Sequence, residues 1–74
     1  MKIYTVHAFR WSNRERHSYI VGVYSDIPNA LNAANIEEEW RGGTKYRCEV
    51  LEWTLDKGIA GDSDIQPKVI KQLN

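Results

Sequence analysis

The sequence predicts an α+β fold, ββαβ in chain order, in which a three-stranded antiparallel sheet carries one helix on one face. Apolar and polar residues alternate along Lys2–Trp11 and Lys45–Leu55, and this period of two is typical of strands. β-Branched and aromatic residues dominate Ser18–Tyr24, which predicts another strand. Signals that start and stop a helix frame the segment Ser25–Gly43. The 74 residues suffice for one such domain.

The first two predicted strands form a hairpin. Tyr4, Val6 and Ala8 share one side of the first strand, and its other side also carries apolar residues. The polar segment Ser12–His17 begins with two turn formers and predicts a connecting loop of five or six residues. Both faces of the sheet are therefore expected to carry apolar groups.

The predicted helix has readable ends. Ser25 and Asp26 offer side-chain oxygens to the first free amides of the helix, and Pro28 stands where a missing N–H costs little. Gly42 and Gly43 supply a left-handed stop. The helix is therefore expected to run from residue 27 or 28 to residue 41.

The inner face of this helix is expected to be thin. Its apolar residues recur mostly at three- and four-residue spacings, and the alanines among them permit close packing on a sheet. Trp40 is expected to lie in the core. Glu37, Glu38 and Glu39 stand near the helix end whose dipole disfavours negative charge by a few tenths of a kcal/mol, with no evident structural return.

The third predicted strand carries two apolar sets on opposite faces, which a bulge near Val50 and Leu51 would reconcile. A right-handed crossover through the helix makes this strand parallel to the second one, and the first strand then fits between them. The expected strand order is 2-1-3 with antiparallel neighbours. The two sets are Tyr46, Cys48 and Val50 on one face and Leu51, Trp53 and Leu55 on the other.

Residues 1–56 are expected to form the single ββαβ domain, followed by a linker and C-terminal tail over residues 57–74. The first part of this tail contains two glycines and no periodic pattern, as a linker does. Pro67–Leu73 contains a small apolar set, and one expectation is that it forms one or two helical turns.

One helix covers only one face of a small sheet, so the apolar groups on the opposite face need another explanation. Exposed apolar patches beyond a few hundred Å² are uncommon on monomers. The sequence therefore predicts a homodimer through the open sheet face, and the alternative is that the C-terminal tail folds back on the sheet.

Composition restricts the compartment and the partners. Ten basic and ten acidic residues cancel, which argues against a general polyanion binder and against an acidic mimic of nucleic acid. Cys48 is the only cysteine, and a chain of this size in an oxidising compartment is usually stapled by disulfides. No secretory signal is recognised, and no apolar run approaches the roughly 20 residues that span a bilayer. A cytoplasmic protein without membrane contact is expected.

Arginine and tryptophan gather around the predicted hairpin loop, together with a histidine. This combination suits phosphate binding and base stacking, and it is equally common at protein interaction hot spots. A charged loop that is merely solvated is the third interpretation. The cluster consists of Arg10, Trp11, Arg14, Arg16 and His17.

The second candidate contact region is acidic. Glu37, Glu38 and Glu39 are expected either to form a solvated face or to meet a basic surface of a protein partner. Successive helical side chains diverge by about 100°, so this triplet is a poor metal clamp.

No catalytic, metal-binding or cofactor-binding pattern is recognised. His7, His17 and Cys48 lack the close paired spacings of a zinc site. An enzyme with a Cys48 nucleophile and a histidine base is one hypothesis for function, but an orienting group and an oxyanion donor are missing from the pattern. The sequence therefore predicts a protein without enzymatic activity and without a cofactor.

The chain resembles small uncharacterised proteins of bacterial phages and mobile elements. The resemblance is carried by the strand Lys2–Phe9, the strand Ile20–Tyr24 with its Gly-Val-Tyr-Ser ending, the capped alanine-rich helix and the late Cys-Glu-Val strand. The resemblance spans about residues 1 to 56. It implies an accessory protein of the bacterial cytoplasm that binds or occludes host macromolecules, as inhibitors of host defence do. The predicted function is thus a protein-interaction module, and the alternative is a nucleic-acid-binding accessory protein that uses the Arg/Trp loop.

Overall fold

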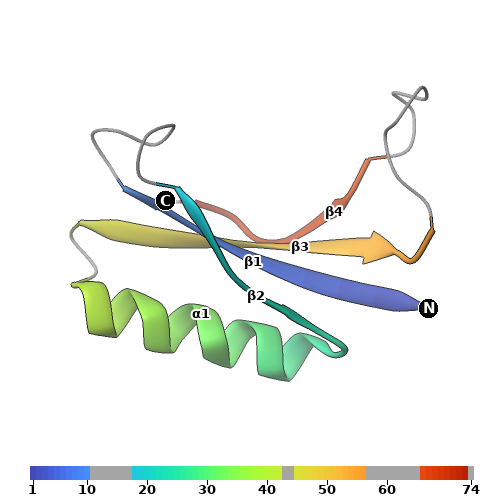
Figure 1. Ribbon diagram of the computed structural model, residues 1–74, viewed down its shortest axis with the longest axis horizontal. Coiled ribbons are helices and arrows are strands. Elements are labelled where there is room, and N and C mark those ends of the chain that lie inside the picture. The colour runs from blue at the N-terminus through green and yellow to red at the C-terminus, as the bar shows by residue number, and fades with distance from the viewer. Residues whose placement is uncertain (11–17, 43–44, 57–65, 74) are drawn as a thin grey trace.

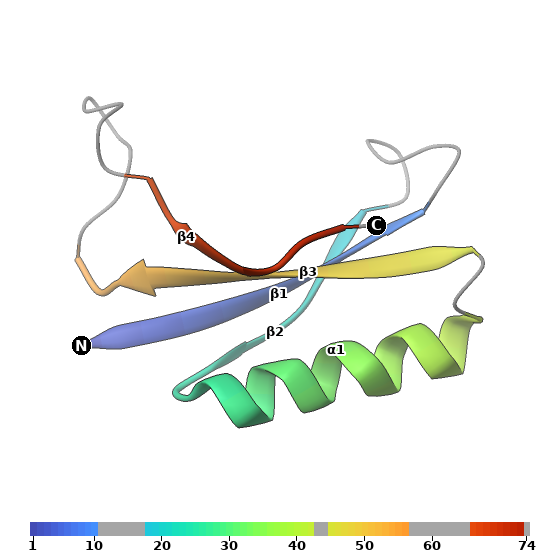
Figure 2. The same ribbon diagram turned by 180° about the vertical axis from the view of Figure 1, so that it is seen from behind.

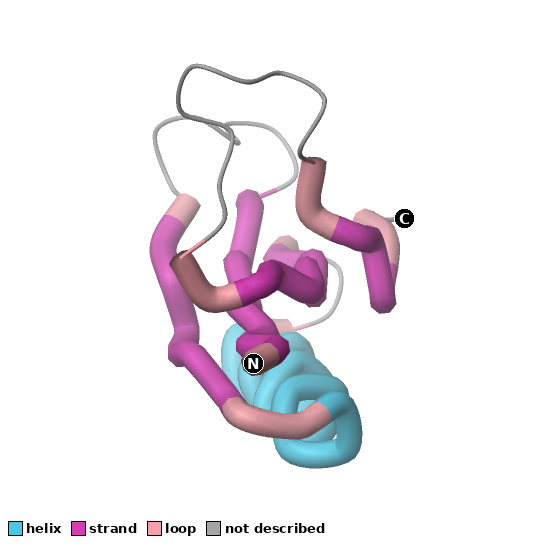
Figure 3. The backbone as a smooth tube through the Cα atoms, turned by 90° about the vertical axis from the view of Figure 1, so that its right-hand side faces the viewer, coloured by secondary structure: helices cyan, strands magenta, loops and turns pink. Residues whose placement is uncertain are grey.

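The computed structural model describes residues 1–10, 18–42, 45–56 and 66–73. One helix lies against one face of a twisted antiparallel sheet, so the predicted α+β class is confirmed (Figure 1). Viewed along the sheet, α1 lies entirely on one side of the strands (Figure 3). The elements are β1 (Lys2–Arg10), β2 (Tyr19–Tyr24), α1 (Ile27–Arg41), β3 (Tyr46–Thr54) and β4 (Lys68–Lys71).

The sheet has four strands in the order β2-β1-β3-β4, and every neighbouring pair is antiparallel. The predicted order 2-1-3 is contained in it, but the predicted number of three strands is wrong. The fourth strand, Lys68–Lys71, replaces the helical turns expected for Pro67–Leu73 and runs along β3 (Figure 2). Val69 and Ile70 are β-branched and favour a strand, and β3 offers them an open edge for pairing.

Two register shifts change which face some side chains occupy. In the β1–β2 pair, Val6 faces Gly22 while His7 faces Ile20, so Val21 is an additional residue in β2. Because of this bulge, Ile20 and Val23 lie on the same face of the sheet although they are three residues apart.

The second shift lies between Val50 and Leu51, where the sequence predicts a bulge. The β1–β3 ladder continues through this step without a break. The shift occurs in the pairing with β4, where Ile70 is the additional residue between Val69 and Lys71.

The core is small and lies between α1 and the helix-facing side of the sheet. Val6 and Val50 stand opposite each other on β1 and β3 and are fully buried. Each contributes about 1.5 to 3 kcal/mol of burial free energy. The buried apolar residues are Tyr4, Val6, Ala8, Ala30, Ala34, Cys48 and Val50.

The ends of α1 follow the prediction. Asp26 is the N-cap, and its Oδ1 accepts the backbone N–H of Asn29 at 2.8 Å. Pro28 stands in the first turn, and Gly42 ends the helix with φ of 82°, a region that favours glycine.

The expectation that Trp40 lies in the core is wrong, since 81% of this residue is exposed. The buried positions of α1 are Ala30, Ala34 and Glu38, which follow one another at four-residue intervals. Trp40 comes two residues after Glu38 and is therefore turned by about 200° from it around the helix axis.

Candidate functional site

Glu38 is a buried carboxylate that completes the edge of β3. Its Oε2 accepts the backbone N–H of Cys48 at 2.8 Å and the ammonium of Lys71 at 3.0 Å. The same ammonium lies 3.4 Å from the carbonyl oxygen of Cys48. Because β4 pairs with β3 only from Val50 onward, Glu38 and Lys71 bond the main chain of Cys48 where a neighbouring strand is absent.

Arg47 adds a second cation beside this carboxylate. Its Nη1 lies 4.0 Å from Oε1 of Glu38, and its Nε is buried without a hydrogen-bond partner within the part of the chain that the structure describes. Asn35, Glu39 and these two residues line an open hollow between α1 and β3. The carboxylate of Glu38 thus interacts with groups of its own chain, on β3 and β4.

Glu37 fixes the other side of α1 to β2. Its Oε2 accepts the hydroxyl of Tyr19 and, at 3.3 Å, the Nε of Arg41. The guanidinium of Arg41 lies 5.7 Å from the ring centroid of Tyr19 and 6.0 Å from that of Tyr46. Burial, together with the hydrogen bond to Glu37, raises the pKa of Tyr19 to about 12.

The predicted acidic contact region therefore divides into three different environments. Glu37 and Glu38 point to opposite flanks of the helix and hold it to the sheet, while Glu39 alone among the three is exposed. Glu37 and Glu38 therefore offset the unfavourable helix-dipole interaction by the hydrogen bonds that they make to the sheet.

The predicted basic cluster lies mostly outside the described residues. Arg10 ends β1 opposite Tyr46 and is half-buried. Trp11, Arg14, Arg16 and His17 are not among the residues that the structure describes.

The hypothesis of a Cys48 nucleophile meets two physical obstacles. Burial, and then the nearby charge of Glu38, raises the pKa of the thiol to about 11, which keeps it protonated at neutral pH. Cys48 faces the core, whereas His7 pairs with Glu49 and therefore projects from the opposite face. In the described segments, no three His, Cys, Asp or Glu side chains are grouped so that they could hold a metal ion.

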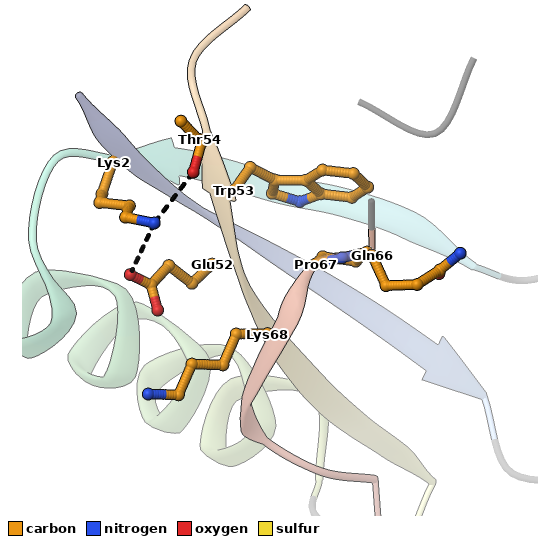
Figure 4. A pocket seen from close by; sticks show the side chains of 7 residues that line it. All are labelled: Lys2, Glu52, Trp53, Thr54, Gln66, Pro67 and Lys68. Carbon is orange, nitrogen blue, oxygen red and sulfur yellow. Dashed lines mark hydrogen bonds and ion pairs between the residues drawn. The ribbon is translucent and has the colours of Figure 1, made fainter. Parts of the chain in front are cut away.

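A small hollow lies at the end of the sheet where β1 begins and β3 ends, and several of its lining residues bond each other. Lys2 donates to Thr54 at 2.9 Å and lies 4.0 Å from Glu52, as Figure 4 shows. Trp53 donates its indole N–H to Thr5 at 2.9 Å. The hollow has a volume of about 120 Å³, well below the several hundred Å³ that small-molecule sites occupy.

The most exposed apolar side chains of the described middle of the chain lie on β2 and α1. Ile20 is 62% exposed and Val23 59%, and both project from the sheet face opposite the helix. On α1, Trp40 is turned by about 60° from Glu37, which contacts β2, whereas Ile36 points away from the sheet. We call Ile20, Val23 and Trp40 the β2-side surface.

The open sheet face predicted for dimerisation is less exposed over its two central strands. Ile3 and Phe9 of β1 and Leu51 and Trp53 of β3 are only partly exposed there. The strongly exposed apolar residues of this face belong to the outer strands. The strongly exposed apolar groups of this face thus lie toward its edges, and a homodimer through the open face stays a prediction.

The two edges of the sheet differ in charge. The strand β2 has the sequence YIVGVY, without a charged residue or a proline. The strand β4 has the sequence KVIK and follows Pro67, and lysines and prolines are the residues with which proteins block edge pairing. The β2 edge lacks this protection. The uncharged run of β2 is the sequence signal that could have identified this edge.

No protein-family model, curated protein or solved structure matches this chain. The only described helix is α1, and it is neither long nor apolar enough to span a membrane.

Proposed function

We propose that this chain is a small protein-binding module without enzymatic activity, and that it binds through the β2-side surface. The observation that carries the proposal is the position of three exposed apolar side chains on and beside an uncharged edge strand. Exposed apolar groups and unpaired strand edges are the two features by which strands and helices recognise other chains.

The composition of this surface favours a protein partner over a polyanion. Tryptophan is enriched at interaction hot spots, and Trp40 presents most of its ring to solvent. The three residues of the β2-side surface are uncharged, so their contribution to binding is hydrophobic. The alternative, nucleic-acid binding by the Arg/Trp loop, stays a prediction from the sequence.

The class of protein follows from the resemblance of residues 1–56 to small phage and mobile-element proteins. In this proposal the chain acts in a bacterial cytoplasm as an accessory protein that binds or occludes a host macromolecule, such as a component of a defence system. The mechanism is steric occlusion, for which a binding surface is sufficient and a catalytic group is not needed.

Affinity capture with matched variants tests the proposal. The wild-type chain should retain specific protein from a bacterial lysate, and Trp40→Glu should lose it, whereas Val69→Lys on the β4 edge should keep it. Circular dichroism confirms that each variant is folded. Retention of the same proteins by wild type and Trp40→Glu would contradict the proposed surface. Retention of labelled DNA or RNA in place of protein, with steep loss at higher salt, would favour the alternative.

A further inference from the structure

We infer that the partner of the β2 edge is a second copy of this chain, paired strand to strand as a two-fold dimer. This inference rests on the proposed function and names a partner for the same surface, for which a host protein would compete with the second copy. The two antiparallel β2 strands would join the two four-stranded sheets into one continuous sheet. Three features of the molecule lead to this arrangement.

The first feature is the absence of charge in β2. Antiparallel pairing places each strand against itself, so any charged residue would meet its own copy or a near neighbour of like sign. The run Tyr19–Tyr24 has no such residue. Pairing of β4 with itself would instead bring Lys68 and Lys71 of both copies together, and pairing of β2 with β4 would give an open-ended chain of copies.

The second feature is the bulge at Val21. It places Ile20 and Val23 on one face of the sheet, one on either side of the centre of the strand. A two-fold axis between Val21 and Gly22 sets Ile20 of each copy beside Val23 of the other. These two strongly exposed apolar residues thus gain cross-strand partners in addition to His7 and Thr5 of β1.

The third feature is the position of the exposed helix residues. A two-fold axis normal to the sheet leaves both helices on the same face, antiparallel to each other. Since α1 packs across β1, β2 and β3, the two helix axes are separated by about three strand spacings, or roughly 14 Å. Helices in direct contact are separated by about 8 to 10 Å, so large side chains are needed between them. Trp40 is turned by about 60° from Glu37, which contacts β2, and is the large side chain of α1 nearest to this space.

The area approaches what a specific interface needs. The exposed parts of Ile20, Val23 and Trp40 amount to roughly 400 Å² per copy, or about 800 Å² for two copies, against about 1,000 Å² for a stable interface. The backbone hydrogen bonds of the new strand pair add to this. Antiparallel helices also place the positive end of each dipole beside the negative end of the other.

Light scattering behind size exclusion tests the inference on the full chain over a wide range of concentrations. The expected mass is twice the 8.6 kDa of one chain. Val23→Lys should raise the dimer dissociation constant more than about tenfold, because it places a charged group against Ile20 of the other copy. Ile20→Lys should do the same and serves as the second variant if Val23→Lys fails to fold.

Val69→Lys is the matched control, since it adds the same charge to a partly exposed valine on the opposite edge. It should leave the dimer intact. A wild-type monomer at every concentration overturns the inference, and so does a dimer that Val69→Lys disrupts while both β2 variants preserve it. A monomer that still retains bacterial protein through Trp40 would overturn the dimer and leave the proposed function standing. A dimer that both β2 variants disrupt, but that retains no bacterial protein, would support the dimer and overturn the binding of a host macromolecule.

Discussion

Removal of the Glu38 carboxylate is expected to destabilise the fold strongly. Glu38→Ala leaves the N–H of Cys48 without its acceptor and the ammonium of Lys71 without its closest anion. Each charge-assisted hydrogen bond of this kind contributes about 1.5 to 3 kcal/mol. Lys71 retains some solvent contact, so we take the lower end of this range for both bonds and expect the free energy of unfolding to fall by about 3 kcal/mol. The whole free energy of unfolding of a domain of this size is roughly 4 to 11 kcal/mol.

Urea unfolding followed by tryptophan fluorescence measures this loss. With a slope of about 1 kcal/mol per M for a small domain, the midpoint should fall by roughly 3 M. Glu38→Gln keeps an oxygen acceptor for Cys48 but loses the charge that faces Lys71, so it should lose about half as much. Glu39→Ala is the matched control on the exposed side and should change stability by less than about 0.5 kcal/mol.

Equal midpoints for Glu38→Ala and Glu39→Ala would refute the interpretation of Glu38 as a bonded edge group. A double-mutant cycle with Lys71→Met separates the ion pair from the bond to the main chain. The coupling energy should be smaller than the loss in Glu38→Ala alone, because the Cys48 amide accounts for part of that loss.

The remaining predictions concern pH, thiol reactivity and one glycine. The pKa of Cys48 is about 11 and that of Tyr19 about 12 in the folded chain, against ordinary values near 9 and 10, so both protonated forms stabilise the fold. Their contribution to the free energy of unfolding is complete below about pH 9 and should be lost as pH rises to about 12, by up to about 2 to 3 kcal/mol for the buried thiol. Urea midpoints that stay constant over this pH range would contradict the prediction. Cys48→Ala should remove the part of the decline that occurs at lower pH. At neutral pH, Cys48 should react with a thiol reagent far more slowly than in urea-unfolded chain, and equal rates would mean that it is accessible. Gly22→Ala should lower stability by about 1 kcal/mol, since the new Cβ would lie 2.7 Å from the hydroxyl oxygen of Tyr24, and an unchanged melting temperature would show that the ring moves aside freely.

Local signals in the sequence predicted the elements that depend on local chemistry. The alternation that places Tyr4, Val6 and Ala8 on one side identified β1, and the Asp26 cap and Gly42 identified the ends of α1. Both rest on interactions within a few residues along the chain. The strand order followed from the handedness of the crossover connection.

The features that were missed depend on contacts between distant segments. The strand β4 is four residues long, and it forms because the edge of β3 is available for pairing. Glu38 is buried because Lys71 and the main chain of Cys48 bond it from other elements. Its position did have a signal, since it continues the four-residue spacing of Ala30 and Ala34. The same spacing places Trp40 away from the core.

Amide hydrogen exchange of β2 at low and high protein concentration tests the central claim most directly, because it reports on the edge backbone itself. We predict that outward-facing amides between Tyr19 and Tyr24 exchange more slowly at high concentration, while amides of β4 are unaffected. The slowing should disappear in Val23→Lys. Exchange in β2 that is independent of concentration, or slowing confined to β4, would contradict the pairing of two copies at the β2 edge.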